Sequence, residues 1–416
     1  MTSVQSLAEL TGLIQQVRQA ARALEKAEQV SVALADAAKA LRAASDKILE
    51  ANTLDLEASL EMAVPGLVLE WLKLTPERLN TAITLLERLA NLDSVTSFAC
   101  RSDLATAPTS HSYVLGEPLG VVAFVYEALP ELAIVAAGLC LRTGNGLILK
   151  GGHEASQTNQ AIATAFQTAF AQTGLPEHTI LMISPSEGEA ARRWLMQTPD
   201  LDLVIPYGRA SLVQQVMREA NSPSLSTAIG NCYLYWAHTA PAEAVAKIVL
   251  DSQQGIPEPI NGIEKILVDA KVSPNALHEL RSLLQAGGLT PEAAKSSPLN
   301  ALHALEDDEI WWHAQLNHAV ILAQVPDLPT AIALINEYSH GHADCIVTNS
   351  YQESVQFTNQ VRSASIYVNA SPRFQRNTSQ ARAIALGMSA QRGLQGGRIG
   401  LDTLLTHKAV IQGFVP

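Results

Sequence analysis

The chain has 416 residues, of which 47% are hydrophobic and only 16% are charged. This length exceeds what one hydrophobic core usually organises, so we expect two or three domains. The 40 Asp and Glu residues outnumber the 28 Lys and Arg residues, and the resulting net charge of −12 argues against a nucleic-acid partner or an anionic membrane surface.

The cysteines predict neither a disulfide framework nor a zinc site. Cys100, Cys140, Cys232 and Cys345 stand far apart in the sequence and form no CxxC pair. Such usage is typical of a reducing cytosol. The amino terminus lacks a basic and then apolar leader, and the long apolar stretches are interrupted by charged residues or proline. We therefore expect a cytoplasmic protein that neither spans a membrane nor binds a metal.

The first quarter of the chain is predicted to be helical. Apolar residues recur at helical spacing through residues 4–60, and residues 67–92 predict a further helical pair. Thr75-Pro76-Glu77 is a good helix start signal, because Thr caps well and Pro is favoured at the first helical position. Residues 93–117 show little periodicity.

A strand–helix–strand unit follows. Its strands are the apolar runs Val121–Tyr126 and Leu147–Lys150, and the helix between them spans Leu132–Leu141. Both runs are too continuously apolar for a half-exposed strand, so they should lie inside a parallel sheet with helices on both faces. Ligands of such sheets bind at the carboxyl ends of the strands, which places residues 126–131 and 150–154 on one rim.

The alternation of strands and helices continues toward the carboxyl terminus. Strands near 179–184, 201–206 and 231–237 extend what is predicted to be a dinucleotide-binding sheet. A second α/β unit follows, and the last piece of the chain ends in a strand-like tail. The predicted domains are residues 1–250, with an arm near 100–117, residues 251–370, and residues 371–416, which return to the first domain.

Six collinear blocks resemble the γ-glutamyl phosphate reductase family, whose members are NADPH-dependent enzymes of proline synthesis in the aldehyde dehydrogenase superfamily. The resemblance implies an α/β, aldehyde-dehydrogenase-like fold with two doubly wound Rossmann-like domains and a small oligomerisation arm. It also implies that the tail pairs with the arm near residue 113 in a homo-oligomer, either a dimer or a tetramer. The blocks are PLGVVAFVYEALPELAIVAAGLCLRTGNGLILKGGHE at 118–154, DLVIP at 202–206, NGIEKILV at 261–268, INEYSHGHADCIVT at 335–348, YVNASPRF at 367–374 and IGLDTLLTHKAVIQG at 399–413.

The catalytic segment departs from the family's pattern. Family members use a cysteine thiolate to displace phosphate, and hydride from NADPH then reduces the resulting thioester. With Asn261 matched to the family's Asn in this catalytic segment, the nucleophile position falls on Ile260, and no cysteine occurs between residues 233 and 344. An isoleucine has no lone pair and no ionisable proton, so it cannot form a thioester.

The oxyanion position departs as well. The family's Arg-Pro-Asn step supplies an amide donor, but here the step is Leu129-Pro130-Glu131. Losing one such donor costs roughly two to three orders of magnitude in rate, and a carboxylate at Glu131 would add repulsion. Four further segments differ from the family in the same direction, at 206–209, 227–233, 311–315 and 380–387.

Other family positions are retained. The resemblance implies that Lys150, Gly151, Gly152 and Glu154, with Pro206 and Gly208 on the same rim, grip NADPH or NADP; a solvated lysine beside a tight turn is the alternative. Asn369, Ser371 and Arg373 match the family's VNASxRF, and Arg373 can clamp a carboxylate or phosphate of the substrate. A domain-bridging salt bridge is the alternative there.

Two further candidates have simpler explanations. Cys232 is a possible substitute nucleophile, but it lies in an apolar strand and is better interpreted as a buried, inert thiol. His340 and His342 are close enough in sequence to share a metal, but no carboxylate–histidine set of ligand spacing surrounds them.

Two functions remain open. The first is an NADPH-dependent reductase that converts L-glutamate 5-phosphate to glutamate 5-semialdehyde. The second is a non-catalytic homologue that binds a nucleotide, a small metabolite or a protein partner. The substitutions at Ile260 and Glu131 favour the second.

Overall fold

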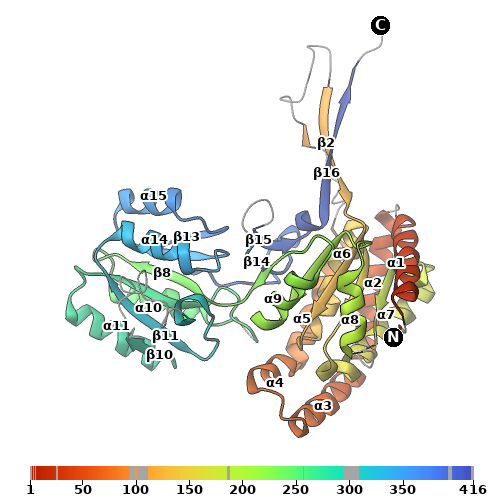
Figure 1. Cartoon of the computed structure of the whole chain (residues 1–416), viewed down its shortest axis with the longest axis horizontal. Helices are drawn as coiled ribbons and strands as arrows, with labels where there is room; N and C mark the ends of the chain where they lie inside the picture. The colour runs from red at the N-terminus through yellow and green to blue at the C-terminus, as the bar shows by residue number, and fades with distance from the viewer. Residues whose placement is uncertain are drawn as a thin grey trace. The chain divides into compact units, whose positions relative to one another are not determined.

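The computed structural model divides the chain into two compact units (Figure 1). Unit 1 comprises Met1–Ser226, Arg376–Leu386 and Arg398–Pro416, and unit 2 comprises Thr227–Gln375 and Gly387–Gly397. The limits at residues 250 and 370 stay predictions of domain extent. The described residues are 2, 4, 6–24, 27–92, 99–100, 111–184, 188–255, 257–293, 309–391 and 396–413.

Helices make up the amino-terminal part of unit 1, as predicted. The start signal at Thr75 is confirmed, because helix α5 begins at Pro76 and the Thr75 side chain accepts a hydrogen bond from the Arg78 amide at 3.3 Å. The helices are α1 (Leu7–Arg22), α2 (Ala27–Ala43), α3 (Ser45–Glu61), α4 (Gly66–Leu72) and α5 (Pro76–Ala90).

A four-stranded parallel sheet with the order β5-β4-β3-β6 is the centre of unit 1. The predicted strand–helix–strand unit is confirmed as β3, α6 and β4, and every residue of these three elements is buried. Continuous burial explains why neither strand alternates between polar and apolar residues. The elements are β3 (Val121–Tyr126), α6 (Glu131–Thr143), β4 (Gly146–Lys150), α7 (Ser156–Thr173), β5 (Ile180–Met182), α8 (Gly188–Gln197), β6 (Leu203–Tyr207) and α9 (Ala210–Glu219).

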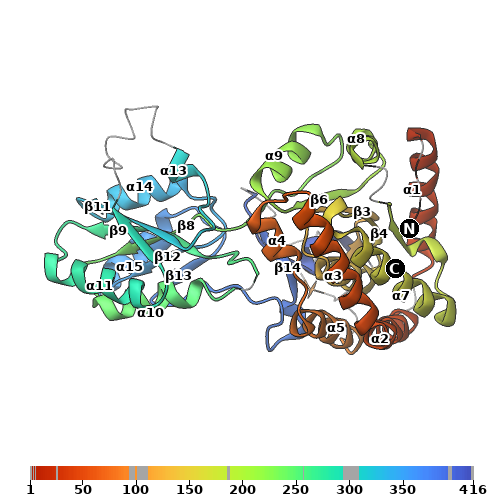
Figure 2. The ribbon, with the colours of Figure 1, turned by 90° about the horizontal axis from the view of Figure 1, so that it is seen from below.

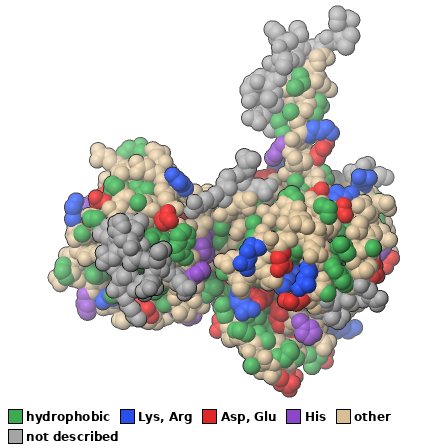
Figure 3. All heavy atoms as spheres, in the orientation of Figure 1, with side chains coloured by type: hydrophobic (Ala, Val, Ile, Leu, Met, Phe, Trp, Pro, Cys, Tyr) green, Lys and Arg blue, Asp and Glu red, His purple; other side chains and the backbone are tan. Residues whose placement is uncertain are grey.

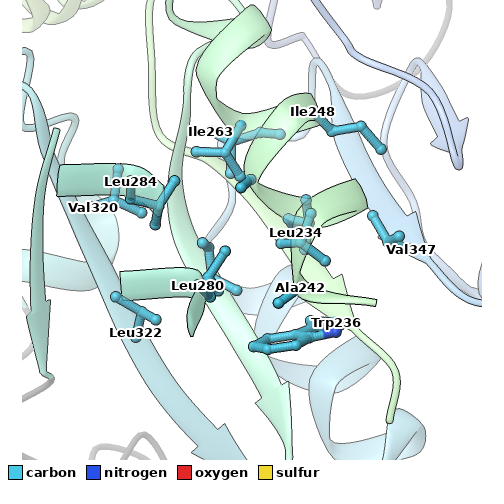
Figure 4. Packing of buried hydrophobic residues seen from close by; sticks show 14 of the residues in the cluster. Leu234, Trp236, Ala242, Ile248, Ile263, Leu280, Leu284, Val320, Leu322 and Val347 are labelled. Atoms are coloured by element: carbon cyan, nitrogen blue, oxygen red, sulfur yellow. The ribbon is translucent and has the colours of Figure 1, made fainter. Parts of the chain in front are cut away.

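A six-stranded parallel sheet with the order β10-β11-β9-β8-β12-β13 is the centre of unit 2. On one face Leu234, Trp236 and Ile263 pack against helices α10 and α11, which contribute Ile248, Leu280 and Leu284 (Figure 4). The elements are β8 (Cys232–Trp236), α10 (Ala242–Ser252), β9 (Ile263–Asp269), α11 (Pro274–Ala286), β10 (Thr290–Ala293), α13 (Glu309–Trp312), β11 (Ala319–Val325), α14 (Leu328–Tyr338), β12 (Asp344–Val347), α15 (Tyr351–Gln360) and β13 (Ile366–Val368).

Strand β8 corrects one prediction. The sequence pattern predicts that the run at 231–237 belongs to the first sheet, but β8 pairs in parallel with β9 and β12 of unit 2. All five residues of β8 are buried. A strand buried on both faces has the same apolar sequence in either sheet, so its pattern does not indicate its neighbours.

An antiparallel arm of three strands belongs to unit 1. It has the order β1-β2-β16, and β16 pairs with β2 from Leu405 opposite Pro118 to Gln412 opposite His111. The predicted pairing of the tail with the arm near residue 113 is therefore confirmed, and the homo-oligomer stays a prediction. The strands are β1 (Ala99–Cys100), β2 (His111–Pro118) and β16 (Leu405–Gln412).

The remaining strands form a small sheet with the order β15-β14-β7, in which β7 (Thr227–Ala228), β14 (Ala385–Ser389) and β15 (Gly397–Gly400) take part. Figure 3 shows acidic and basic side chains side by side on the visible face of unit 1. A search of the described helices finds none with the length and hydropathy that a membrane span requires.

Candidate functional site

The carboxyl ends of β3 and β4 border a pocket of about 240 Å³ in unit 1. This is the edge of a parallel sheet at which ligands bind. Four of the predicted cofactor residues, Lys150, Gly151, Gly152 and Glu154, line the pocket together. The other lining residues are Val125, Tyr126 and Glu127 from β3 and its end, His153 after β4, Gly188, Glu189 and Arg192 from α8, and Leu212 from α9.

Lys150 and Glu154 are both bound to backbone groups. The Lys150 ammonium donates to the Gly151 carbonyl at 2.9 Å, and the amide of Ala128 donates to Glu154 Oε1 at 2.5 Å. Burial lowers the pKa of Lys150 and raises the pKa of Glu154. A Cβ atom on Gly152 would lie 2.0 Å from Glu154 Oε1, so the glycine leaves the room that this carboxylate occupies.

The other two predicted cofactor residues lie at the carboxyl end of β6, on the same rim of the sheet. Pro206 lies within β6, and Gly208 follows that strand, where an added Cβ would come within 2.8 Å of the Glu127 side chain. Neither residue is part of the pocket lining. The next residue, Arg209, donates from Nε to both carboxylate oxygens of Glu127 at 3.0 and 2.9 Å. This ion pair ties the β6–α9 turn to the end of β3.

Glu131 is the first residue of α6, and its carboxylate is paired. The Arg78 Nε atom lies 2.9 Å from Glu131 Oε1, and a second guanidinium nitrogen donates to the same oxygen. Glu131 Oε2 is buried and has no hydrogen-bond partner among the described residues. The two residues before Pro130 are strained, because Ala128 and Leu129 have φ angles of 50° and 43°. Position 131 therefore carries a hydrogen-bond acceptor whose charge is compensated by Arg78, and not the donor of the family.

Ile260 and Asn261 lie in the interior of unit 2, between α10 and β9. Each is 1% exposed. The Ile260 carbonyl accepts from the Gly230 amide at 2.9 Å, and Asn261 Nδ2 donates to the Pro372 carbonyl at 2.8 Å. The side chain at position 260 is therefore a buried hydrocarbon, and its backbone is fixed by hydrogen bonds.

His342 lies between Ile260 and Cys232. Its Nε2 atom is 2.9 Å from the Ile260 carbonyl oxygen and 3.2 Å from Cys232 Sγ. A carbonyl oxygen only accepts, so Nε2 must carry the hydrogen. Burial lowers the pKa of His342 to about 3, so the ring is neutral near pH 7. Because its hydrogen is on Nε2, the lone pair of the ring lies on Nδ1. Nε2 therefore cannot take the proton of Cys232.

Cys232 has the properties of an unreactive thiol. Cys232 is fully buried. Burial raises the pKa of its thiol well above the usual value, and the charges of Asp344 and Glu264 raise this pKa further. The geometry fits the interpretation of Cys232 as a structural residue. Among the described residues, no three His, Cys, Asp or Glu side chains gather in a way that could hold a metal ion.

The predicted substrate residues come together in one turn of unit 2. The Asn369 side chain accepts from the Thr348 amide at 2.9 Å and donates to the Thr348 carbonyl at 2.8 Å. The Ser371 hydroxyl accepts from the Arg373 amide at 3.2 Å. Arg373 Nη1 lies 3.1 Å from Gln254 Oε1 and 3.4 Å from Asp251 Oδ1. Each of the three residues thus has an internal partner, and the ion pair of Arg373 lies within unit 2.

Comparisons with known proteins identify the relatives of this chain. A model of the aldehyde dehydrogenase family matches residues 6–231. The chain is 41% identical over 380 residues to γ-glutamyl phosphate reductase 2 of Synechocystis sp., with 90% of each chain covered. The chain belongs to the γ-glutamyl phosphate reductase family.

Further relatives agree. The γ-glutamyl phosphate reductase of Gloeobacter violaceus is 35% identical over 386 residues, which cover 92% of this chain and 91% of the relative. The crystal structure of γ-glutamyl phosphate reductase from Thermotoga maritima matches with a TM-score of 0.86 at 27% identity, covering 97% of this chain and 98% of that chain. The γ-glutamyl phosphate reductase resemblance and the aldehyde-dehydrogenase-like α/β fold are both confirmed.

Sequence analysis of this family member missed two charged residues of unit 1, Arg78 and Arg192, and it placed Glu127 on the rim without assigning it a role. Arg78 pairs with a residue 53 positions away, and no local pattern indicates such a contact. Glu127 follows β3 directly and lies within the segment 126–131 that the rule for ligands at the carboxyl ends of strands places on the rim. Arg192 follows β5 on the same edge and lines the pocket from α8.

Proposed function

We propose that this γ-glutamyl phosphate reductase family member binds a nicotinamide dinucleotide in the β3–β4 pocket and does not carry out the family's thioester chemistry. The observation that carries this proposal is the buried Ile260 at the position where the resemblance implies the nucleophilic cysteine. Attack on an acyl phosphate requires a thiolate or another strong nucleophile, and a hydrocarbon supplies none.

The described thiols are poor substitutes. Cys140, Cys232 and Cys345 are all buried, and burial raises the pKa of each, that of Cys140 to about 12. Thiolate is the reactive form, so such thiols stay protonated and unreactive near neutral pH. The side chain of Cys100 lies outside the described residues.

The pocket fits the adenosine end of NADPH or NADP. Gly151 and Gly152 keep the turn after β4 open, since a Cβ on Gly151 would lie 2.4 Å from Asn159 Nδ2. That same Nδ2 atom is buried without a partner among the described residues. Lys150 supplies a cation and Glu154 an acceptor for ribose hydroxyls. Bound NADPH would supply hydride to a carbonyl carbon, and bound NADP would accept hydride in the reverse direction.

An active reductase is the second candidate. It is favoured by the 41% identity to a relative named γ-glutamyl phosphate reductase 2. In that case L-glutamate 5-phosphate would be the substrate. For either candidate we further propose a cytoplasmic homo-oligomer that associates through the β2–β16 arm. A non-catalytic member could also bind a small metabolite or a protein partner.

One assay separates the two candidates. The purified full chain is mixed with glutamate 5-semialdehyde, phosphate and NADP, and the absorbance of NADPH is followed. We expect no rate above the background without protein, and we expect NADPH to raise the midpoint of thermal unfolding. A turnover of about 1 s⁻¹ or faster, as in ordinary dehydrogenases, would reject the proposal. A double variant Ile260→Cys with Glu131→Asn tests whether the two family residues restore a rate.

A further inference from the structure

A groove of about 620 Å³ lies on the surface of unit 1, along the packed pair of helices α2 and α7. The two helices lie side by side in Figure 2. The apolar residues that line the groove are all alanines, namely Ala40, Ala43, Ala44, Ala161 and Ala165. Short side chains leave the space open, and large apolar side chains of a partner bind best where they fill such a space. We call this feature the α2–α7 groove.

Two cations border the alanines of the groove. Lys39 and Lys47 belong to its lining, together with one acid, Asp36. Lys39 lies 2.8 Å from Asp36, but the lysine side chain is 79% exposed, and such a surface pair is weak and easily exchanged. Lys47 makes no hydrogen bond or ion pair with any described residue. The groove therefore suits a partner that combines apolar side chains with acidic ones.

The end of helix α3 carries that combination. Leu54, Leu60 and Met62 are 48%, 65% and 54% exposed. Glu57 and Glu61 are also exposed, lie one helical turn apart beside Leu60, and have no partner among the described residues. Figure 3 shows hydrophobic and acidic side chains together at the lower end of unit 1, where Figure 1 has α3. Clustered exposed apolar residues of this kind are typical of interaction surfaces. We call these five residues the α3 ridge.

The α3 ridge cannot fill the groove of its own chain. Lys47 stands in the first turn of α3 and Leu60 in the last turn. At a rise of about 1.5 Å per residue, these two positions are about 20 Å apart along the helix axis. A ridge that occupies an α2–α7 groove must therefore come from another molecule.

We propose that the α3 ridge of one copy of this chain docks in the α2–α7 groove of a second copy. Leu60 and Met62 enter the space above the alanines, and the two glutamates of the ridge meet Lys39 and Lys47. Ridge and groove are different surfaces, so the contact is heterologous, and its repetition builds a ring or an open chain of copies. The contact is separate from the β2–β16 arm. It is small and therefore weak, so it adds to any other assembly only at high protein concentration.

The test measures the average mass of the full chain by light scattering over a range of protein concentrations. A ridge variant carries Glu57→Lys and Glu61→Lys, and a groove variant carries Lys39→Glu and Lys47→Glu. We expect the mass of wild type to rise with concentration, and each variant to need about tenfold more protein or higher for the same rise. An equimolar mixture of the two variants should regain the rise, because the lysine-bearing ridge then meets the glutamate-bearing groove.

A control variant separates this contact from a general effect of charge. Glu279→Lys with Glu337→Lys makes the same change of net charge at exposed positions of unit 2 and should associate like wild type. Salt of about 1 M should suppress the rise in mass, since it screens exposed charges. A wild-type mass that is independent of concentration would overturn the inference. Association of the ridge variant at wild-type concentrations, or a mixture that stays apart, would overturn it as well.

Discussion

Arg78 and Glu131 form a buried ion pair that joins α5 to the start of α6. Arg78 Nε lies 2.9 Å from Glu131 Oε1, and the two side chains are only 10% and 7% exposed. Arg78 Nη2 also donates to the Trp71 carbonyl at 3.0 Å. Sequence reasoning expected an uncompensated carboxylate at the oxyanion position. The pair neutralises that charge, but it does not supply the hydrogen-bond donor that an oxyanion needs.

Replacing Arg78 with Leu should destabilise unit 1 strongly. The change leaves the Glu131 carboxylate buried without its partner, and breaking such a pair costs about 3–5 kcal/mol. Urea unfolding measures the loss. Arg42→Leu is the matched control, because the Arg42–Glu87 pair is 49% and 43% exposed and should be worth less than about 1 kcal/mol. Equal losses in the two variants would contradict the buried-pair argument.

Thiol titration should find no reactive cysteine among the buried ones. In a Cys100→Ser background only Cys140, Cys232 and Cys345 remain, and all three are buried with raised pKa values. We expect Ellman's reagent to label no thiol of the native protein and three after addition of denaturant. Rapid labelling that maps to Cys232 in the native state would show an accessible thiolate and would revive it as a nucleophile.

Acid should destabilise the protein through His342. Burial lowers the pKa of His342 to about 3, whereas a histidine in the unfolded chain has a pKa near 6.5. The unfolded state therefore takes up the proton first, so this contribution to stability is complete above pH 6.5 and declines as the pH falls toward 3. Between pH 6 and 4, the free energy of unfolding of His342→Gln should therefore fall less steeply than that of wild type, by about 1.4 kcal/mol per pH unit.

The pH dependence is read as a difference between variant and wild type. The buried Asp344, whose pKa is raised to about 7, has the opposite slope in both proteins and cancels in that difference. The half-buried His340, with its pKa lowered to about 4, is present in both proteins, so its own titration cancels in the same way. His278→Gln, on the exposed side of α11, is the control for loss of a histidine. Identical slopes of unfolding free energy against pH for His342→Gln and wild type would contradict the prediction.

Gly152→Ala should weaken nucleotide binding. The added methyl group would lie 2.0 Å from Glu154 Oε1, so the carboxylate must leave the Ala128 amide that now holds it. NADPH affinity, measured by calorimetry, should fall by about tenfold. The matched control is Gly12→Ala in α1, where nothing lies within 4 Å of the new atom. That change should leave binding intact and raise stability by about 0.5–1 kcal/mol.

Removal of the tail should change the oligomeric state. In the described arm, β16 is an edge strand whose outer backbone groups are open to another strand. We expect the full chain to be a dimer or tetramer by light scattering, and a chain ending at Leu404 to be a monomer. Lys408→Gln keeps the strand and removes only the Lys408–Glu117 pair, so it should stay oligomeric. A monomeric full chain would contradict the predicted assembly.

The sequence predicted the elements better than their neighbours. The runs that became β3 and β4 are apolar throughout and separated by one helix, and adjacent parallel strands with a short crossover follow directly from that. The run that became β8 has the same pattern, and its sheet depended on pairing with β9 and β12, which lie later in the chain.

In the site too, contacts within one segment could be predicted from the sequence, and contacts between distant segments could not. Lys150 to Glu154 form one contiguous turn, so their meeting in the pocket follows from the chain itself. The contact between Arg78 and Glu131 and the hydrogen bond from His342 to Ile260 join distant segments. Such contacts depend on how helices and loops pack, and neither periodicity nor composition carries that information.

The ladder between β2 and β16 has a consequence for biosynthesis. Its Lys408–Glu117 pair spans 291 positions, and unit 2 lies in the sequence between its two strands. The ribosome releases β2 long before it synthesises β16, so the edge of β2 that pairs with β16 stays without its partner strand until translation ends. During that interval the nascent chain depends on chaperones, or on the speed of its own completion, to avoid pairing with a neighbour.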